Sequence, residues 1–384
     1  MAFIYYLTHI QFDHGAISLL KSECERVGIS RPMIVTDKGV RAAGIVDKAI
    51  AALGLKDSKQ PSAIFDDVPS NPTEAAVQAG LLAYRAGQCD GIIAVGGGSA
   101  IDCAKGISIL TPQGGVLKTY ATIEGGSPRI SESIAPIIAV PTTSGTGSEV
   151  ARGAILIVED GRKLGFHSWH LVPKAAICDP QLTLGLPAGL TAATGMDAIA
   201  HCIESFLAPN FNPPADGIAI DGLRRGWAHI ERATKNGADA EARFQLMSAS
   251  MQGAMAFQKG LGCVHSLSHS LGGVNPRLHH GTLNAMFLPA VVRFNSEAES
   301  VQKEDRLARM AHVMGLASGS DVAPALADMV HRLGLPKGLK EMGVTTDLFD
   351  KIIDGAVADH CHKMNPRIAT REEYSELLEV SMKL

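Results

Sequence analysis

Short apolar runs rich in β-branched residues recur through the first half of the chain, and each ends at a turn signal. They are Met33–Thr36, Gly91–Val95, Ala135–Val140 and Ala175–Cys178. Runs of this length without polar alternation are typical of strands that are buried on both faces. Stretches with helical spacing, such as Pro72–Ala86, lie between them. This order predicts an α/β domain with a mostly parallel, Rossmann-like sheet and crossover helices.

The strand signal ends near the segment Leu186-Pro-Ala-Gly189, and Ala, Leu, Met and His at helical spacing dominate the rest of the chain. We therefore expect two domains, an α/β dinucleotide-binding domain over residues 1–187 and an all-helical metal-binding domain over residues 188–384. The chain has 384 residues and is 46% hydrophobic, which is enough for a sizeable core.

The composition argues against several function classes. The formal net charge is −4, and no basic run or aromatic-interleaved basic patch suggests nucleic-acid binding. No apolar stretch reaches the roughly 20 residues that a membrane span needs. The first residues, Met-Ala-Phe-Ile-Tyr-Tyr-Leu-Thr-His, lack a basic region and predict a first strand, not a signal peptide. Seven scattered cysteines without a CxxC motif fit a reducing cytoplasm.

A glycine-rich turn follows the second buried run, in the segment Ala94-Val-Gly-Gly-Gly-Ser-Ala-Ile-Asp-Cys-Ala-Lys105. Gly96, Gly97 and Gly98 let the backbone approach a ligand closely, and the helix that follows offers free N–H groups to a pyrophosphate. Ser99 can donate to a phosphate oxygen. Ile101 replaces the third glycine of G-x-G-x-x-G, so this is not the usual dinucleotide fingerprint. A tight strand-to-helix turn without a ligand is the alternative.

Two further loops follow buried runs and support a nucleotide site. The segment Val140-Pro-Thr-Thr-Ser-Gly-Thr-Gly-Ser-Glu149 offers hydroxyls, among them Thr142, Thr143 and Ser148, to ribose and phosphate groups. It lacks the glycine two residues before Ser144 that a hydrolase elbow requires. Asp37 ends the first run and is placed to accept from a ribose 2′-hydroxyl, which favours NAD over NADP. A helix cap explains Asp37 equally well.

Pairs of metal-ligand residues are spaced i,i+4 in the second half of the chain. Asp197 and His201 form the first pair, and His265 and His269 form the second; the segment His279-His-Gly281 follows. On a helix, each pair points two side chains toward one object. An imidazole-rich set with one carboxylate suits a divalent transition metal such as iron or zinc. A helical histidine is also common as an ordinary core or surface residue, so the spacing alone leaves both interpretations open.

Taken in order, four motifs resemble those of the iron-containing (group III) alcohol dehydrogenases. They are Gly-Gly-Gly-Ser-x-x-Asp-x-Ala-Lys, Pro-Thr-Thr-Ser-Gly-Thr-Gly-Ser-Glu, Gly-Met-Asp-Ala-x-x-His, and His-x-x-x-His followed by His-Gly-x-x-Asn-Ala. The resemblance runs over nearly the whole chain and implies the two-domain architecture of dehydroquinate synthase-like proteins. Within the family, the opening residues and the segments Gly165-Phe-His-Ser-Trp-His170 and Leu278-His-His-Gly281 are most similar to bacterial 4-hydroxybutyrate dehydrogenases.

The resemblance also implies roles for individual residues. It assigns a divalent metal, Fe²⁺ or Zn²⁺, to Asp197, His201, His265 and the histidine before Gly281. Alignment on Gly281 selects His280, whereas counting from His269 selects His279; we prefer His280. His269 is expected beside the nicotinamide as the catalytic residue. Around the cofactor NAD the resemblance adds further residues to the glycines, Asp37 and Ser99, namely Asn71, Asp102, Thr142, Thr143, Ser148 and Leu182. Lys163 occupies another family-like position without an assigned role.

The implied activity is NAD- and metal-dependent interconversion of a small primary alcohol and its aldehyde, with 4-hydroxybutyrate and succinic semialdehyde as the best candidates. A divalent metal lowers the pKa of an alcohol and polarises an aldehyde, and His269 can relay the proton to solvent. A substrate carboxylate needs a cation or donor at the far end of its pocket. Arg152 is one candidate, and Cys361 and Lys363 belong to a second segment; an ordinary surface charge is the alternative for Arg152 and Lys363.

Other functions stay open at this point. One is a general short-chain alcohol dehydrogenase or a lactaldehyde/propanediol-type reductase. A second is a lyase or cyclase that holds metal and NAD without net redox chemistry, as in dehydroquinate synthases. A third is a metal hydrolase or a binding module. The expected partners are a small alcohol or aldehyde and a second copy of the chain in a homodimer, in the cytoplasm, without nucleic acid or membrane.

Overall fold

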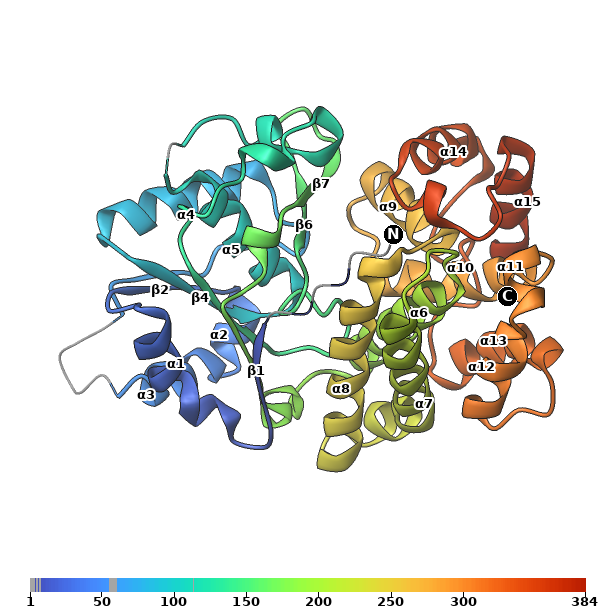
Figure 1. Cartoon of the computed structure of the whole chain (residues 1–384), viewed down its shortest axis with the longest axis horizontal. Coiled ribbons are helices and arrows are strands. Elements are labelled where there is room, and N and C mark those ends of the chain that lie inside the picture. Colours follow the sequence, from blue (N-terminus) through green and yellow to red (C-terminus); the bar gives the residue numbers. More distant parts are fainter. Residues whose placement is uncertain (1–3, 5, 7, 55–60, 113) are drawn as a thin grey trace. The chain divides into compact units, whose positions relative to one another are not determined.

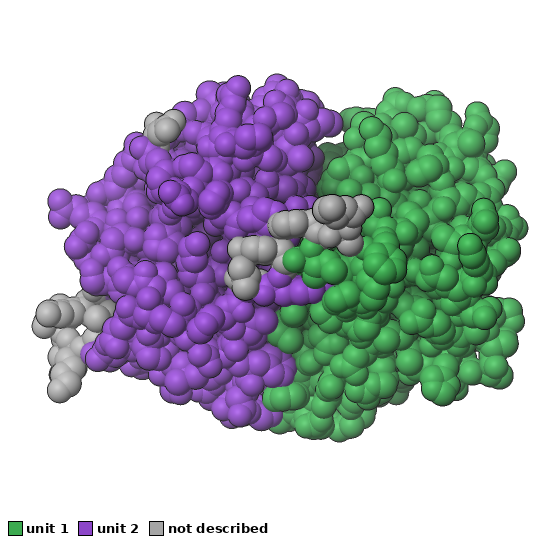
Figure 2. All heavy atoms as spheres, in the orientation of Figure 1, with its two compact units in different colours: residues 1–5, 144–146, 186–384 green, residues 6–143, 147–185 purple. Residues whose placement is uncertain are grey.

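The structure, a computed structural model, describes Ile4, Tyr6 and residues 8–54, 61–112 and 114–384. These residues form two compact units, which Figure 2 colours separately. Unit 1 contains Ile4, Ser144–Thr146 and Leu186–Leu384, and unit 2 contains Tyr6–Thr143 and Gly147–Gly185. Much of the segment expected as a first strand lies outside the described residues; the strand β1 spans His9–Phe12. The division at Leu186 lies next to the expected boundary at residue 187, but the short segment Ser144–Thr146 was not expected in the helical unit.

Unit 2 is built on a parallel sheet (Figure 1). In the described part of the chain this sheet has six strands in the order β1-β8-β5-β4-β2-β3, all paired in parallel. The strands after β1 are β2 (Pro32–Val35), β3 (Ala63–Phe65), β4 (Gly91–Gly96), β5 (Ile137–Pro141) and β8 (Ala175–Cys178). The four runs read from the sequence are β2, β4, β5 and β8, so the prediction of a parallel α/β fold is confirmed.

Helices cover both faces of this sheet because side chains alternate along each strand. Ile92 and Ala94 of β4 pack in one buried cluster with α4 (Glu74–Ala86) and α5 (Gly98–Leu110). Ile93 and Val95 pack in another cluster with α1 (Leu20–Val27) and α3 (Ile45–Ala52), while the short α2 spans Lys38–Ala42. This explains why the strands read as unbroken apolar runs. An antiparallel hairpin of β6 (Gly153–Ile157) and β7 (Lys163–His167) was not expected.

Unit 1 is built from helices and has no strand among its described residues, as the sequence predicts. Its helices are α6 (Ala188–Leu207), α7 (Pro213–Lys235), α8 (Ala240–Ala256), α9 (Cys263–Val274), α10 (His280–Asn295), α11 (Glu299–Lys303), α12 (Arg306–Met314), α13 (Val322–Arg332), α14 (Phe349–Ala358) and α15 (Arg371–Ser381). The central helix α6 packs against α7, α8 and α10, and α9 packs against α10 and α14. Among the described residues, no helix has the length and apolar character to cross a membrane.

Glycines let the central helices approach closely enough to bring polar side chains together. A Cβ on Gly281, at the start of α10, would lie 2.3 Å from the carbonyl oxygen of Ala193 in α6. A Cβ on Gly253 in α8 would lie 2.9 Å from Cβ of His201. Both distances are shorter than real Cβ contacts allow, so a larger residue at either position would push a neighbouring helix away from α6. These contacts place α6 at the centre of the candidate metal site.

Candidate active site

Three helices of unit 1 each bring an i,i+4 pair into the same region of the unit. Helix α6 carries Asp197 and His201, α9 carries His265 and His269, and α10 carries His280 together with Asn284 at the i+4 position. The side chains of Asp197, His201 and His265 are almost completely buried. The periodicity predicted from the sequence therefore places these side chains on faces that meet.

The geometry of the cluster fits a single divalent metal. Nε2 of His201, of His265 and of His280 each lies 3.8 Å from Oδ1 of Asp197. Tetrahedral ligands at about 2.0–2.2 Å from a metal lie roughly 3.4 Å apart, which is close to this spacing. Ligand atoms of Asp197, His201 and His265 also lie within 4.8 Å of one another. Three imidazoles and one carboxylate that converge in this way form a donor set suited to iron or zinc.

His280, not His279, lies at this cluster. The side chain of His280 is 25% exposed, and its ring centroid is 5.4 Å from that of His265. His279 is the exposed residue before the first turn of α10. Of the two histidines left open by the sequence, His280 is therefore the one that the geometry favours as fourth ligand.

Burial keeps the imidazoles of His201 and His265 neutral. Desolvation lowers the pKa of His201 to about 4 and that of His265 to about 3, against the opposing charge of Asp197. Neutral imidazole is the form that binds a metal, because the ligating nitrogen must carry a free lone pair. At neutral pH no proton has to be removed from a charged imidazolium before a metal enters.

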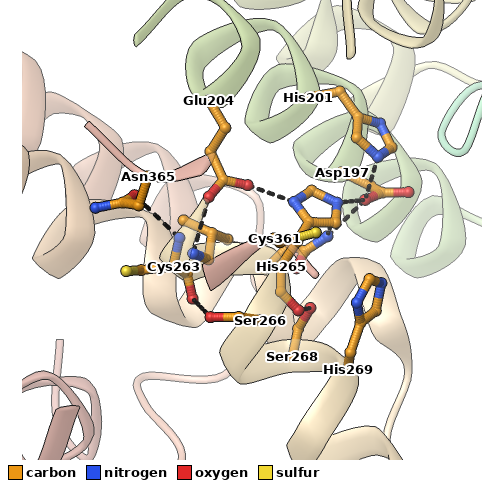
Figure 3. A network of polar contacts seen from close by, with 12 residues as sticks. Asp197, His201, Glu204, Cys263, His265, Ser266, Ser268, His269, Cys361 and Asn365 are labelled. Atoms are coloured by element: carbon orange, nitrogen blue, oxygen red, sulfur yellow. Dashed lines mark hydrogen bonds and ion pairs between the residues drawn. The ribbon is translucent and has the colours of Figure 1, made fainter. Parts of the chain in front are cut away.

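Two groups contact the candidate ligands from outside the set, although the sequence analysis gave neither of them a role. Asn284 donates from Nδ2 to Oδ1 of Asp197 at 2.6 Å. Glu204 lies against Nδ1 of His265 (Figure 3). Burial raises the pKa of the Glu204 carboxyl to about 8 although the Val264 N–H opposes it, and a divalent cation at the neighbouring ligands would lower that pKa again. The signal for Glu204 was its place on α6, three residues after His201.

His269 has a carboxylate partner in a separate small cluster. Its Nδ1 lies 3.0 Å from Oδ2 of Asp359, which follows α14. Oδ1 of Asp359 accepts from the backbone N–H of Cys361 at 2.8 Å. Although burial raises the pKa of Asp359, the charges of His269 and His360 and these hydrogen bonds lower it overall. Asp359 therefore stays ionised and holds His269 with Nε2 available for proton exchange.

The glycine-rich turn of unit 2 lies at the carboxyl edge of the parallel sheet. Adjacent strands β2 and β4 continue to β3 and β5, on opposite sides of the pair, and ligands of open α/β sheets bind at such a point. Gly96 has φ +158°, and a Cβ there would lie 2.6 Å from Cβ of Ala100. A Cβ on Gly97 would meet Oγ1 of Thr143 at 3.2 Å. The turn therefore leaves little room for side chains beside the first turn of α5, where Gly98 begins the helix.

Other predicted cofactor residues lie at the same edge. Asp37 caps α2, since its Oδ1 accepts from the Val40 N–H at 2.9 Å, while its Oδ2 lies near Gly96. Asp37 is therefore a helix cap, as one of the two alternatives predicted. Its second oxygen, Oδ2, still lies beside the glycine turn. Ser99 donates to the carbonyl oxygen of Ser70 at 2.5 Å, and Asn71 accepts from Nζ of Lys163 at 3.0 Å. The Thr142 N–H donates to the carbonyl oxygen of Gly96 at 3.0 Å.

Three predicted cofactor residues are engaged inside unit 2. Asp102 accepts from the hydroxyl of Ser148 at 2.6 Å and from the Ile155 N–H at 2.9 Å. Ser148 also accepts from the buried Lys105. Leu182 belongs to the buried cluster around Val95 and Val140. These contacts fasten the loop and the hairpin to the sheet, and direct contact of Asp102, Ser148 or Leu182 with a cofactor stays a prediction.

The substrate candidates lie in different units. The guanidinium of Arg152 stacks over the ring of Trp169 in unit 2, with its carbon 4.8 Å from the ring centroid, and burial lowers its pKa. Cys361 is buried in unit 1, with Sγ 3.4 Å from Nε2 of His360, and burial raises its pKa well above the usual value. Lys363 is exposed in the 3₁₀ turn His362–Met364. Arg152 is thus a partly desolvated cation, whereas Lys363 is a solvated one.

Comparison with known proteins matches both parts of the chain to one enzyme family. Residues 8–180 match the family model described as iron-containing alcohol dehydrogenase, and residues 191–382 match the model for the C-terminal region of the same family. A 4-hydroxybutyrate dehydrogenase from Cupriavidus necator is 67% identical over the full length of both chains. A 1,3-propanediol dehydrogenase from Klebsiella pneumoniae is 36% identical over 95% of each chain.

Solved structures agree with these matches. A 1,3-propanediol oxidoreductase is similar with a TM-score of 0.90 at 34% identity, over 98% of this chain and 99% of the other. A sulfoacetaldehyde reductase from Bifidobacterium kashiwanohense, solved in complex with NAD⁺, has a TM-score of 0.89 at 26% identity over 100% of this chain and 99% of its own. The similarity thus covers both the sheet unit and the helical unit.

Proposed function

Because the chain belongs to the iron-containing alcohol dehydrogenase family, we propose that it interconverts 4-hydroxybutyrate and succinic semialdehyde with NAD as cofactor. The substrate is supported by the 67% identity to the dehydrogenase from Cupriavidus necator. The observation that carries the chemistry is the convergence of three Nε2 atoms on one carboxylate oxygen of Asp197. In the forward direction the alcohol carbon gives a hydride to NAD⁺ and the hydroxyl gives a proton to solvent.

The residues of unit 1 would hold the metal and handle the proton. Asp197, His201, His265 and His280 would bind a divalent ion, which when bound lowers the pKa of an alcohol and polarises an aldehyde. His269, fixed at Nδ1 by Asp359, presents Nε2 as a proton acceptor in oxidation and a donor in reduction.

The glycine turn of unit 2 would hold the pyrophosphate of NAD. The first N–H groups of α5 and the turn Gly96–Gly98 form the cradle, and Oδ2 of Asp37 would accept from the adenosine ribose. This arrangement disfavours a 2′-phosphate through charge repulsion. The NAD⁺ complex of the similar sulfoacetaldehyde reductase supports this choice of cofactor.

A cation would select a substrate that carries a carboxylate. Arg152 is our first candidate because its guanidinium is partly buried and lies over the ring of Trp169. A charge-assisted hydrogen bond contributes roughly 1.5–3 kcal/mol, which gives about a ten- to hundredfold preference over an uncharged alcohol of the same length. Lys363 is the second candidate, in the segment with Cys361.

We also expect a homodimer in the cytoplasm. Free thiols at all seven cysteines fit a reducing compartment. Light scattering of the purified enzyme tests the oligomeric state, and a monomeric mass would overturn that part of the proposal.

Initial rates with NAD⁺ test the proposed reaction. Metal-loaded enzyme should oxidise 4-hydroxybutyrate with a specificity constant about ten- to hundredfold above that for 1-butanol. Arg152→Met should erase most of this preference and leave butanol turnover nearly intact, with Lys363→Met as the matched comparison. If wild type prefers 1-butanol, the enzyme is a general short-chain alcohol dehydrogenase.

A further inference from the structure

Glu204 is a buried carboxylate that the metal ligand set does not include. It lies on α6 one turn after His201, and only 3% of its surface is exposed. Its Oε2 contacts Nδ1 of His265, while Oε1 accepts from the Val264 N–H at 2.9 Å. Figure 3 shows Glu204 and Asp197 on opposite sides of the His265 ring. The two nitrogens of His265 are therefore each matched to a different carboxylate of the same helix.

The start of α9 is shaped to receive this side chain. Cys263 donates its N–H to Oδ1 of Asn365 at 3.0 Å, so side chains from outside the helix satisfy the N–H groups of both Cys263 and Val264. A Cβ on Gly262 would lie 2.3 Å from Oδ1 of Asn365 and 3.0 Å from Oε1 of Glu204. The positive end of the helix dipole also favours a carboxylate at this position. Glu204 thus fixes both the rotation of α9 and the ring that α9 carries.

We propose that Glu204 is a positioning residue that holds His265 in the tautomer with the proton on Nδ1, so that the lone pair of Nε2 faces Asp197 and the metal. With a divalent cation at the neighbouring ligands Glu204 is ionised, and a carboxylate has no hydrogen to donate, so a bond to it requires the proton on Nδ1. With that proton fixed, Nε2 can only accept, which is what metal binding requires. The proposal rests on the metal site of the proposed function. Its test measures metal binding and does not depend on turnover.

The variant Glu204→Gln distinguishes this role from simple space filling. If the glutamine Oε1 accepts from Val264, its NH₂ group faces Nδ1 of His265, and the imidazole must then carry its proton on Nε2, toward the metal. If the amide is reversed, its NH₂ group faces the Val264 N–H, so that two donors oppose each other. The first orientation therefore forces the proton of His265 onto Nε2, and the second loses the bond to the Val264 N–H, while neither changes the volume of the side chain.

The test measures Zn²⁺ affinity of the full-length protein by competition with a chromophoric chelator. Glu204→Gln should bind Zn²⁺ roughly 10- to 100-fold more weakly than wild type. Glu74→Gln is the matched control, because Glu74 is also buried and its two oxygens accept backbone N–H groups of Leu117 and Glu159 at 2.7 and 3.0 Å. That control should keep wild-type Zn²⁺ affinity. Wild-type affinity in Glu204→Gln would overturn the proposal.

A second measurement on wild type does not depend on the variant being folded. In Zn²⁺-loaded protein labelled with ¹⁵N-histidine, the resonances of His265 should show a protonated Nδ1 and a metal-bound Nε2. The signals are assigned by their loss in His265→Ala. A Zn²⁺-loaded His265 that binds through Nδ1, or that lacks a proton there, would contradict the role of Glu204. Failure to oxidise 4-hydroxybutyrate would leave both results unaffected.

Discussion

The side-chain amide nitrogen of Asn284 lies 2.6 Å from Oδ1 of Asp197, the oxygen on which three imidazoles converge. The same nitrogen is 3.2 Å from Nε2 of His265 and 3.2 Å from Nε2 of His280. The oxygen of Asp197 and the two ring nitrogens are all acceptors, so the NH₂ group of Asn284 can donate to them where no cation is bound. The acceptor atoms of the cluster thus face one common position, which a cation could occupy. Glu204 contacts the other ring nitrogen of His265, Nδ1.

Replacement of His280 by alanine should strongly reduce the metal content of the purified enzyme. Nε2 of His280 lies 3.8 Å from Oδ1 of Asp197, and the variant loses one of the four proposed ligands, which weakens metal binding. His279→Ala is the matched control, since His279 is the exposed neighbour, and it should keep the wild-type metal content. Elemental analysis of the two variants decides. The reverse pattern would move the fourth ligand by one residue.

Gly97→Val should abolish NADH binding. A Cβ at this position would already meet Oγ1 of Thr143 at 3.2 Å, and the branched side chain of valine would project into the turn that is expected to hold the pyrophosphate. Fluorescence titration with NADH measures the effect. Gly217→Val, on an exposed face of α7 with open space around it, should bind NADH like wild type. If Gly97→Val binds NADH with wild-type affinity, the pyrophosphate does not bind at this turn.

Asp37→Asn should raise activity with NADP⁺ relative to NAD⁺. Asparagine keeps an oxygen that can accept from the Val40 N–H, so the cap of α2 survives while the negative charge is lost. Without that charge a 2′-phosphate is no longer repelled. The ratio of specificity constants for the two cofactors reports the effect. If the ratio stays at its wild-type value, Asp37 serves as a cap alone and cofactor preference arises elsewhere.

Lys105→Met should destabilise the enzyme by at least about 3 kcal/mol. Nζ of Lys105 is buried and donates to the carbonyl oxygens of Ser148, Ala151 and Gly153 at 2.7–2.9 Å, and to the Ser148 hydroxyl at 2.9 Å. Methionine fills a similar volume but leaves these acceptors without a donor. Chemical unfolding measures the loss, with the exposed Lys21→Met as control. A free energy of unfolding equal to wild type would show that water replaces the ammonium.

The sequence predicted those parts of the fold that local pattern determines. The strands β2, β4, β5 and β8 are continuous apolar runs because helices cover both faces of the sheet. Strand β3, Ala63–Phe65, is too short to give such a run, and the hairpin β6–β7 depends on buried groups such as Asp102 and Lys105. Those contacts join residues far apart in the chain, which local spacing does not reveal.

The same limit applies to the candidate site. The i,i+4 pairs Asp197/His201 and His265/His269 follow from the helical period, and the resemblance supplied the choice of His280. Glu204 and Asp359 escaped notice because a single carboxylate on a helix or a helix end has no distinctive spacing. Their significance comes from side-chain contacts between α6 and α9 and from the packing of α14 against α9, which bring each carboxylate to a histidine.

The most direct test of the account is metal reconstitution followed by NADH absorbance. Metal-free enzyme is mixed with 4-hydroxybutyrate and NAD⁺, and Fe²⁺ or Zn²⁺ is then added in steps. We predict no NADH formation before metal addition, a rate that rises until the metal is equimolar with the enzyme, and no activity in His265→Ala at the same metal concentration. NADH formation by the metal-free enzyme at the rate of the loaded enzyme would contradict the account.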